Sequence, residues 1–205
     1  MAGGRRRFSD VEKRRAVDMI LGEGRTAAAV SSELGVSTAS LRRWVRAHRA
    51  REWAGRVADH FGWLEQRGFT VIETDASWFW AWTVVYRRLS AAILVIQNRE
   101  YGCVDVQLVR AAANAPLARR WIRVDGEVTG MAYASKLIWL RASDPEEMLD
   151  RIDGLGLTPP ELDTQLAFWA AVLQTYGQDF LAGDLGVLDQ PDPVVRHRRR
   201  KWRRA

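Results

Sequence analysis

The chain has 205 residues, 47% of them hydrophobic and ten of them tryptophan, so it is long and apolar enough to bury the core of one or two domains. No apolar run approaches the ~20 residues of a membrane span, and no apolar h-region follows the basic start, so we expect neither a membrane partner nor secretion. The single cysteine, Cys103, excludes an internal disulfide and is expected to be a buried small hydrophobe.

The net charge of +6 is unevenly distributed along the chain. Residues 1–51 carry 12 basic and 5 acidic side chains, residues 52–191 carry 12 and 19, and residues 192–205 carry 7 and 1. Polyanions are bound by Lys and Arg side chains that displace condensed counterions, so nucleic acid is expected at the two basic ends. The 28 arginines against 3 lysines are typical of a GC-rich genome and point to a bacterial or phage origin.

Two helices are predicted in the first 35 residues. Ser9 and Glu12 have the spacing of a capping box and begin a helix that the glycines of LGEG end. Thr26 is the expected N-cap of a second helix of about two turns, and Gly35 can adopt the left-handed conformation at its end.

A third helix is predicted after the short connection Gly35-Val36-Ser37, with Ser37 as its N-cap. Such a connection is typical of the sharp turn between two crossed helices. Leu41, Trp44 and Val45 fall on one side of this helix and are expected to face the first two helices.

The opposite side of the third helix is the predicted contact surface. An arginine there can pair with guanine O6 and N7 in the major groove, and a small side chain can contact a thymine methyl group. The simpler alternative is a charged, solvated helix face. The predicted DNA-contacting residues, which include a basic N-terminal arm, are Ser37, Thr38, Ala39, Ser40, Arg42, Arg43, Arg46, Arg5, Arg6 and Arg7.

Residues 5–49 resemble the N-terminal helix-turn-helix of insertion-sequence transposases, in the family whose small first protein binds the ends of the element. Four segments carry the resemblance: Phe8-Ser9, Arg15-Ala16-Val17, Glu33-Leu34-Gly35-Val36-Ser37 and Leu41-Arg42-Arg43-Trp44-Val45. The resemblance implies a three-helix, double-stranded-DNA-binding domain with residues 37–49 as the recognition helix. The lone cysteine and the lack of a secretory segment predict a cytoplasmic protein, and DNA binding predicts that it is nucleoid-associated.

The chain departs from that family after the helix-turn-helix. Proteins of the family usually continue into a leucine zipper, whereas Trp53, Val57, Phe61 and Leu64 keep helical spacing for barely three turns before Gly68. One helix-turn-helix covers few base pairs, and tight DNA binding usually requires a second copy of it. Self-association, if present, therefore requires another part of the chain.

Residues 52–190 are predicted to form an α+β domain. After a helix from Trp53 to Gly68, segments rich in β-branched and aromatic residues predict an antiparallel meander with a turn at 98–100, and further strands are expected at 119–124 and 134–142. On the strand 101–110, one face should meet the core and most of the other should meet water. Helices are predicted at 145–152 and 159–183. A homodimer or a protein partner of this domain is expected.

Three other functions were considered for the middle of the chain. Trp78, Trp80 and Trp82 alternate along one strand and could stack single-stranded bases, although core packing or a protein interface is the simpler reading. Asp75 and Asp105 could belong to the carboxylate set of a recombinase, but no His-Ser-Asp-Xaa-Gly signature is present. The loose resemblance to immunity-type proteins of toxin systems suggests an acidic domain that binds a protein.

The segment 189–194 contains two prolines and is predicted to be a domain boundary. Residues 191–205, which begin within it, are predicted to be a disordered basic tail. Its expected role is auxiliary contact with DNA phosphates, and the alternative is a solubilising tail. The residues expected to make these contacts are Arg198, Arg199, Arg200, Lys201, Arg203 and Arg204.

The chain as a whole is predicted to combine a helix-turn-helix domain (1–51), an acidic α+β domain (52–190) and the tail (191–205). The three histidines, His48, His60 and His197, are scattered and form no metal-binding motif. We therefore expect no metal, no cofactor and no catalytic residue. The predicted function is sequence-specific DNA binding, as a transcriptional regulator or as an accessory factor of a mobile element. The alternative is an immunity or antitoxin-type interaction protein.

Overall fold

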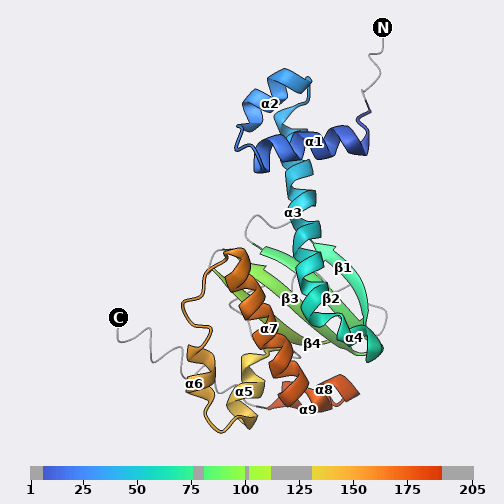
Figure 1. The fold of residues 1–205 in the computed structure, drawn as a ribbon. Coiled ribbons are helices and arrows are strands. Elements are labelled where there is room, and N and C mark those ends of the chain that lie inside the picture. The colour runs from blue at the N-terminus through green and yellow to red at the C-terminus, as the bar shows by residue number, and fades with distance from the viewer. Residues whose placement is uncertain (1–6, 76–80, 100–101, 112–130, 191–205) are drawn as a thin grey trace. The chain divides into compact units, whose positions relative to one another are not determined.

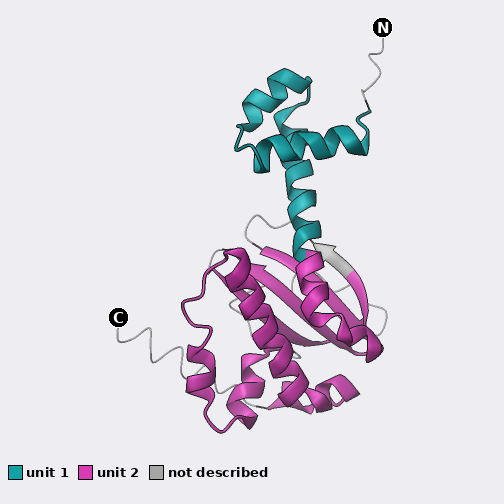
Figure 2. Cartoon of the chain, in the orientation of Figure 1, with its two compact units in different colours: residues 1–53 teal, residues 54–205 magenta. Residues whose placement is uncertain are grey.

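The computed structural model describes residues 7–75, 81–99, 102–111 and 131–190 (Figure 1). The chain divides into two compact units, residues 1–53 and residues 54–205 (Figure 2). The helix α3, Thr38–Phe61, contributes residues to both units.

Unit 1 consists of α1 (Asp10–Leu21), α2 (Ala27–Leu34) and the first part of α3. Ser9 and Glu12 form the predicted capping box, in which the Glu12 amide donates to Ser9 Oγ and the Ser9 amide donates to the Glu12 carboxylate. The Ala29 amide donates to the Thr26 hydroxyl at the start of α2. Gly35 ends α2 with φ 62°, a left-handed conformation that glycine adopts without a steric penalty.

The three helices of unit 1 enclose one apolar cluster. Its buried members are Ala16, Val17, Met19, Val30, Val36, Leu41 and Trp44. Phe8 precedes α1 and packs edge-on against Trp44, with the ring centroids 5.3 Å apart. Because α1, α2 and α3 all contribute to this cluster, the rotation of α3 about its own axis is fixed within unit 1.

Unit 2 contains a five-stranded sheet in which every neighbouring pair is antiparallel and the strand order is that of the chain. The strands are β1 (Thr70–Asp75), β2 (Ala81–Arg88), β3 (Ala91–Asn98), β4 (Cys103–Arg110) and β5 (Met131–Tyr133). The helices of unit 2 after α3 are α4 (Trp63–Gln66), α5 (Ser135–Arg141), α6 (Pro145–Asp150), α7 (Pro159–Tyr176), α8 (Gln178–Ala182) and α9 (Gly186–Asp189). A helical N-terminal region followed by an α+β part is thus confirmed.

The helix α7 protects the part of β4 that β5 does not cover. Strand β5 pairs with β4 at residues 107–109, which leaves Val104 outside the pairing. The Val104 amide donates to Gln165 Oε1 at 2.7 Å, and the Val104 carbonyl accepts from Trp169 Nε1 at 2.9 Å. Two side chains of α7 therefore satisfy a backbone position that would otherwise be an open sheet edge.

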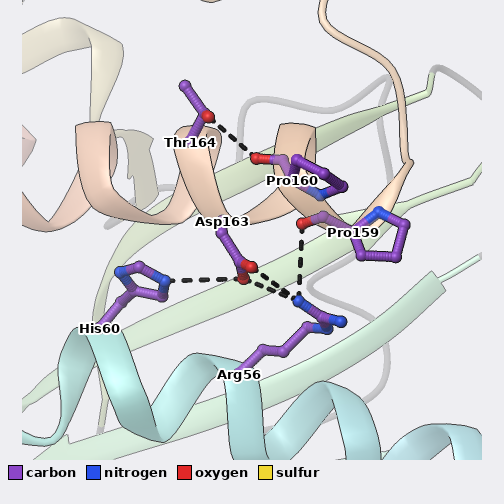
Figure 3. A network of polar contacts seen from close by, with 6 residues as sticks. All are labelled: Arg56, His60, Pro159, Pro160, Asp163 and Thr164. Carbon is purple, nitrogen blue, oxygen red and sulfur yellow. Dashed lines mark hydrogen bonds and ion pairs between the residues drawn. The ribbon is translucent and has the colours of Figure 1, made fainter.

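The C-terminal part of α3 is fastened to α7 inside unit 2 (Figure 3). Arg56 Nη1 donates to both carboxylate oxygens of Asp163, at 2.9 and 2.8 Å, and His60 Nε2 lies 3.7 Å from Asp163 Oδ1. The pair is about one third exposed at Arg56 and nearly one half exposed at Asp163, so solvent screening limits its contribution to about 1 kcal/mol or less. The fully buried Val57 and Phe61 of the same helix contribute apolar contacts as well.

Two predictions about helices and strands are wrong. Residues 134–142 form α5 and not a strand, with Leu137 and Ile138 buried. A short apolar run has no periodicity that separates a buried strand from one buried helical turn. The sequence predicted one helix at 37–49 and another that begins at Trp53. In the structure they form a single helix, α3, which ends at Phe61, because no glycine or proline lies between the two predicted segments. The strand predicted at 119–124 lies outside the described residues.

The prediction that most of the second face of β4 meets water is also wrong. Gln107 is buried and Asp105 is partly buried on that face. Buried apolar residues of β2, β3 and β4, among them Val85, Leu94 and Val109, cluster there, so the sheet buries both faces. Cys103 is partly buried rather than fully buried, and Trp78 and Trp80 lie outside the described residues.

Candidate nucleic-acid interface

The start of α3 is held by a hydroxyl cap at the turn after α2. Ser37 Oγ accepts the Ser40 amide at 3.2 Å, and the two serine hydroxyls are 3.0 Å apart. Val36, between Gly35 and Ser37, is buried in the core of unit 1. The turn is therefore anchored, and both serines have a structural role in it whether or not they also contact DNA.

The apolar side of α3 lies where the sequence predicts it. Leu41 is fully buried, Trp44 is 9% exposed and Val45 packs against the same cluster. Because α3 buries this side in the core of unit 1, its opposite side faces away from that core. Ala39, Arg42 and Arg43 are exposed.

The remaining predicted contact residues lie in several environments. Thr38 and Ser40 are partly buried near the start of α3, and Ser37 is exposed. Arg46 is partly buried and has a partner within the protein. Arg7 is exposed ahead of α1. Arg5 and Arg6 of the N-terminal arm, and Arg198, Arg199, Arg200, Lys201, Arg203 and Arg204 of the tail, lie outside the described residues.

The arginines of unit 2 that the structure describes all have partners within the protein. Arg56, Arg110, Arg141 and Arg151 pair with carboxylates, and Arg88 donates to a backbone carbonyl. The other partnered arginines are Arg67, Arg87 and Arg99. These guanidinium groups therefore contribute to the structure of unit 2, and four of the eight are paired with a carboxylate.

Several arginines of unit 1 differ in this respect. Arg42, Arg43 and Arg49 of α3 form no hydrogen bond or ion pair with any residue that the structure describes. The same holds for Arg15 of α1. Unpaired guanidinium groups on one side of an exposed helix create a positive potential that favours an anionic ligand.

Local sequence explains why the charges on α3 are unpaired. No Asp or Glu occurs from Leu34 to Arg51, so no carboxylate is available at helical i, i+3 or i, i+4 spacing to Arg42 or Arg43. Arg49 has Glu52 three residues after it, but the Glu52 carboxylate lies near His48 Nε2, at 3.7 Å. By contrast, Arg25 before α2 is bound by Glu33, a hydrogen bond that raises the pKa of Arg25. The contact pattern adds Arg15 and Arg49 to the candidate cations, and no signal in the sequence distinguishes Arg49, because Glu52 stands three residues after it.

The exposed cationic stripe of α3 has a definite end. Arg43, Arg46, Ala50 and Trp53 follow one another at spacings of three and four residues, so they lie along one side of the helix. Ala50 is 7% exposed and Trp53 is 2% exposed, and both are therefore buried. On this side of α3 the accessible part is thus confined to residues 38–49, about 18 Å of helix.

The N-terminal segment matches a known family. Residues 2–59 match a family model described as Transposase, a model of the transposase helix-turn-helix. The segment is a transposase-type, DNA-binding helix-turn-helix. The resemblance seen in residues 5–49 is thereby confirmed, and the match covers a little more than a quarter of the chain. No curated protein and no solved structure matched the chain.

The sheet does not bring together the two carboxylates considered for a recombinase centre. Asp75 pairs in register with Thr83, Thr83 with Ile96, and Ile96 with Asp105. Three inter-strand steps place the two Asp backbones about 14 Å apart, whereas two-metal catalysis requires ions about 4 Å apart that share ligands. Among the described residues, no group of three or more His, Cys, Asp or Glu side chains is placed to hold a metal ion.

None of the described helices combines the length and the apolar character that crossing a membrane requires. The helix-turn-helix is a binding module and is not catalytic by itself.

Proposed function

We propose that the protein binds double-stranded DNA sequence-specifically, with residues 38–49 of α3 in the major groove. The observation that carries the proposal is the contrast between the two units. The described arginines of unit 2 have partners within the protein. By contrast, the exposed Arg42 and Arg43 and the partly buried Arg49 of α3 have no hydrogen bond or ion pair to a described residue. A phosphate or a guanine edge can satisfy such groups without breaking an existing contact.

In this proposal the basic ends of the chain add affinity without sequence preference. Arg5, Arg6 and Arg7 precede α1, and seven basic side chains follow residue 195. Contacts of this kind go to phosphates, which position a protein on DNA and carry no direct sequence information. The biological role is that of a transcriptional regulator or an accessory factor of a mobile element, and the protein performs no chemistry on the DNA.

The proposal is tested by selecting bound duplexes from a pool with about 20 random base pairs at physiological ionic strength. The expected result is an enriched motif. Arg43→Ala should then weaken binding to the selected duplex by about 5- to 150-fold, the range expected for one base-reading arginine. Recovery of a pool with no sequence preference would refute sequence-specific binding.

Arg151→Ala is the matched control, because it also removes one exposed guanidinium group. Arg151 is the C-cap residue of α6 and pairs with Glu147 of the same helix. The affinity of this variant for the selected duplex should equal that of the unmodified protein. An equal loss in Arg43→Ala and Arg151→Ala would mean that net charge alone governs binding.

The tail is tested separately by ending the chain after Gln190. Each phosphate contact that is lost should make the slope of log K against log salt concentration shallower by about 0.9. The selected motif should be unchanged. An identical slope with and without residues 191–205 would remove the tail from the interface.

We further propose that unit 2 binds a second copy of the chain, because one recognition helix reads too few base pairs for tight binding. Sedimentation of the full chain, free and bound to the selected duplex, tests this. The proposal requires two copies per duplex and a motif with two-fold symmetry. One copy on an asymmetric motif would exclude it. A catalytic transposase gene and inverted repeats beside the gene would favour the accessory role over a regulatory one.

A further inference from the structure

The exposed side of α3 carries two stripes of different shape. Ala39, Arg43 and Ala47 follow one another at steps of four residues, and all three are exposed. Arg42 and Arg49 are seven residues apart and therefore lie almost in line on a second stripe. At about 100° per residue, Arg43 lies about 110° around the helix from the middle of the Arg42–Arg49 stripe.

The first stripe carries only small side chains apart from Arg43. Alanine methyl groups stand on both sides of Arg43, so the helix backbone can approach a surface closely with one long side chain projecting toward it. Edges of bases at the floor of the major groove are accessible to such a surface, and one arginine there can bond guanine O6 and N7 in a bidentate manner.

The second stripe has the opposite character. Arg42 is exposed and Arg49 is partly buried. They are about 10 Å apart along the helix axis, and neither has a hydrogen bond or ion pair to a described residue. When one side of a helix faces the groove floor, the side roughly 90° away faces a phosphate backbone. Arg46 lies between the two stripes and already has a partner within the protein.

We infer that Arg43 is the base-reading residue of this helix, specific for guanine, and that Arg42 and Arg49 bind phosphates on one wall of the groove. The inference rests on the proposed function and assigns different roles to residues that lie side by side in the sequence. It predicts that the geometry of the guanidinium group is essential at position 43 and that charge is sufficient at position 42.

Charge-preserving variants test the division directly, because lysine keeps the charge but cannot form the bidentate pair. Selection from the random duplex pool is repeated with the full chain carrying Arg43→Lys or Arg42→Lys. Arg43→Lys should lose the preference for guanine at one position of the motif, a discrimination of about 10- to 100-fold, with an unchanged salt slope. Arg42→Lys should enrich the motif of the unmodified protein.

A second pair of variants tests whether the first stripe requires small side chains beside Arg43. Ala47→Leu retains high helix propensity but adds bulk beside Arg43, so it should weaken binding to the selected duplex at least tenfold while leaving binding to unrelated duplex unchanged. Ala171→Leu, at an exposed position of α7, is the control and should change neither. Circular dichroism of both variants should match that of the unmodified protein.

The outcomes separate this inference from the proposed function. If the unmodified protein enriches no motif, sequence-specific binding itself fails. If it enriches a motif that Arg43→Lys retains, or that Arg42→Lys loses, DNA binding stands and the assignment of Arg43 as the base reader is overturned. Equal affinity of Ala47→Leu and the unmodified protein for the selected duplex would also overturn it.

Discussion

Leu41→Ala is expected to destabilise unit 1 selectively and thereby to weaken DNA binding, without altering any residue of the proposed contact surface. Leu41 has no exposed surface and belongs to the cluster that fixes the rotation of α3. Truncating a fully buried leucine typically costs about 2–5 kcal/mol, because transfer energy is lost and a cavity remains.

The stability of unit 1 sets the scale of this effect. At about 0.05–0.15 kcal/mol per residue, a module of its 53 residues has a free energy of unfolding of about 3–8 kcal/mol. The substitution therefore removes between about a quarter and all of that stability. Apparent DNA affinity should fall in proportion to the fraction of molecules in which unit 1 is folded.

Hydrogen exchange read out by mass spectrometry measures this prediction peptide by peptide. Peptides from residues 10–48 should lose protection in Leu41→Ala, and peptides from the sheet of unit 2 should keep it. Leu140→Ala is the control, since Leu140 is 37% exposed on α5 and its truncation should cost less than about 1 kcal/mol. Unchanged protection of residues 10–48, or an equal effect of the two substitutions, would refute the assignment of Leu41 to the apolar cluster that holds α3 in unit 1.

Three further substitutions test local features. Gly55→Ala should raise the free energy of unfolding by about 0.5–1 kcal/mol in urea titrations, because Gly55 is inside α3 and an added Cβ meets no atom within 4 Å. Gln165→Met should lower it by about 1–3 kcal/mol, since the buried Val104 amide loses its acceptor. Thr158→Val should destabilise at pH 7 and less so in acid. The Thr158 hydrogen bond lowers the pKa of Glu161 below its usual 4.5, so that contribution is present above pH 4.5 and is lost as pH falls through the lowered pKa.

Each of these has a result that contradicts it. A lower free energy of unfolding in Gly55→Ala would mean that the space around position 55 cannot accommodate an added methyl group. A neutral Gln165→Met would show that β4 does not depend on α7 for its edge. A Thr158→Val penalty that is constant from pH 7 to pH 3 would show that the Glu161 carboxylate is not the group involved.

Unit 1 was predictable from sequence because its signals are local. Caps at Ser9, Thr26 and Ser37 and the left-handed glycine at position 35 act within a few residues. The sheet strands were also recognisable by composition, whereas residues 134–142 were assigned to a strand and form α5. Burial of that segment depends on elements far away in the chain, which periodicity over one short run does not report.

By itself the sequence determined that three capped helices precede an α+β region and that α3 turns Leu41 and Trp44 inward and arginines outward. These features follow from helix geometry and local hydrogen bonds. The tertiary structure decided which cations remain unpaired, since partners such as Asp163 for Arg56 and Asp179 for Arg141 come from distant positions. It also decided where the exposed stripe of α3 ends, because the burial of Ala50 and Trp53 depends on packing that no local pattern encodes.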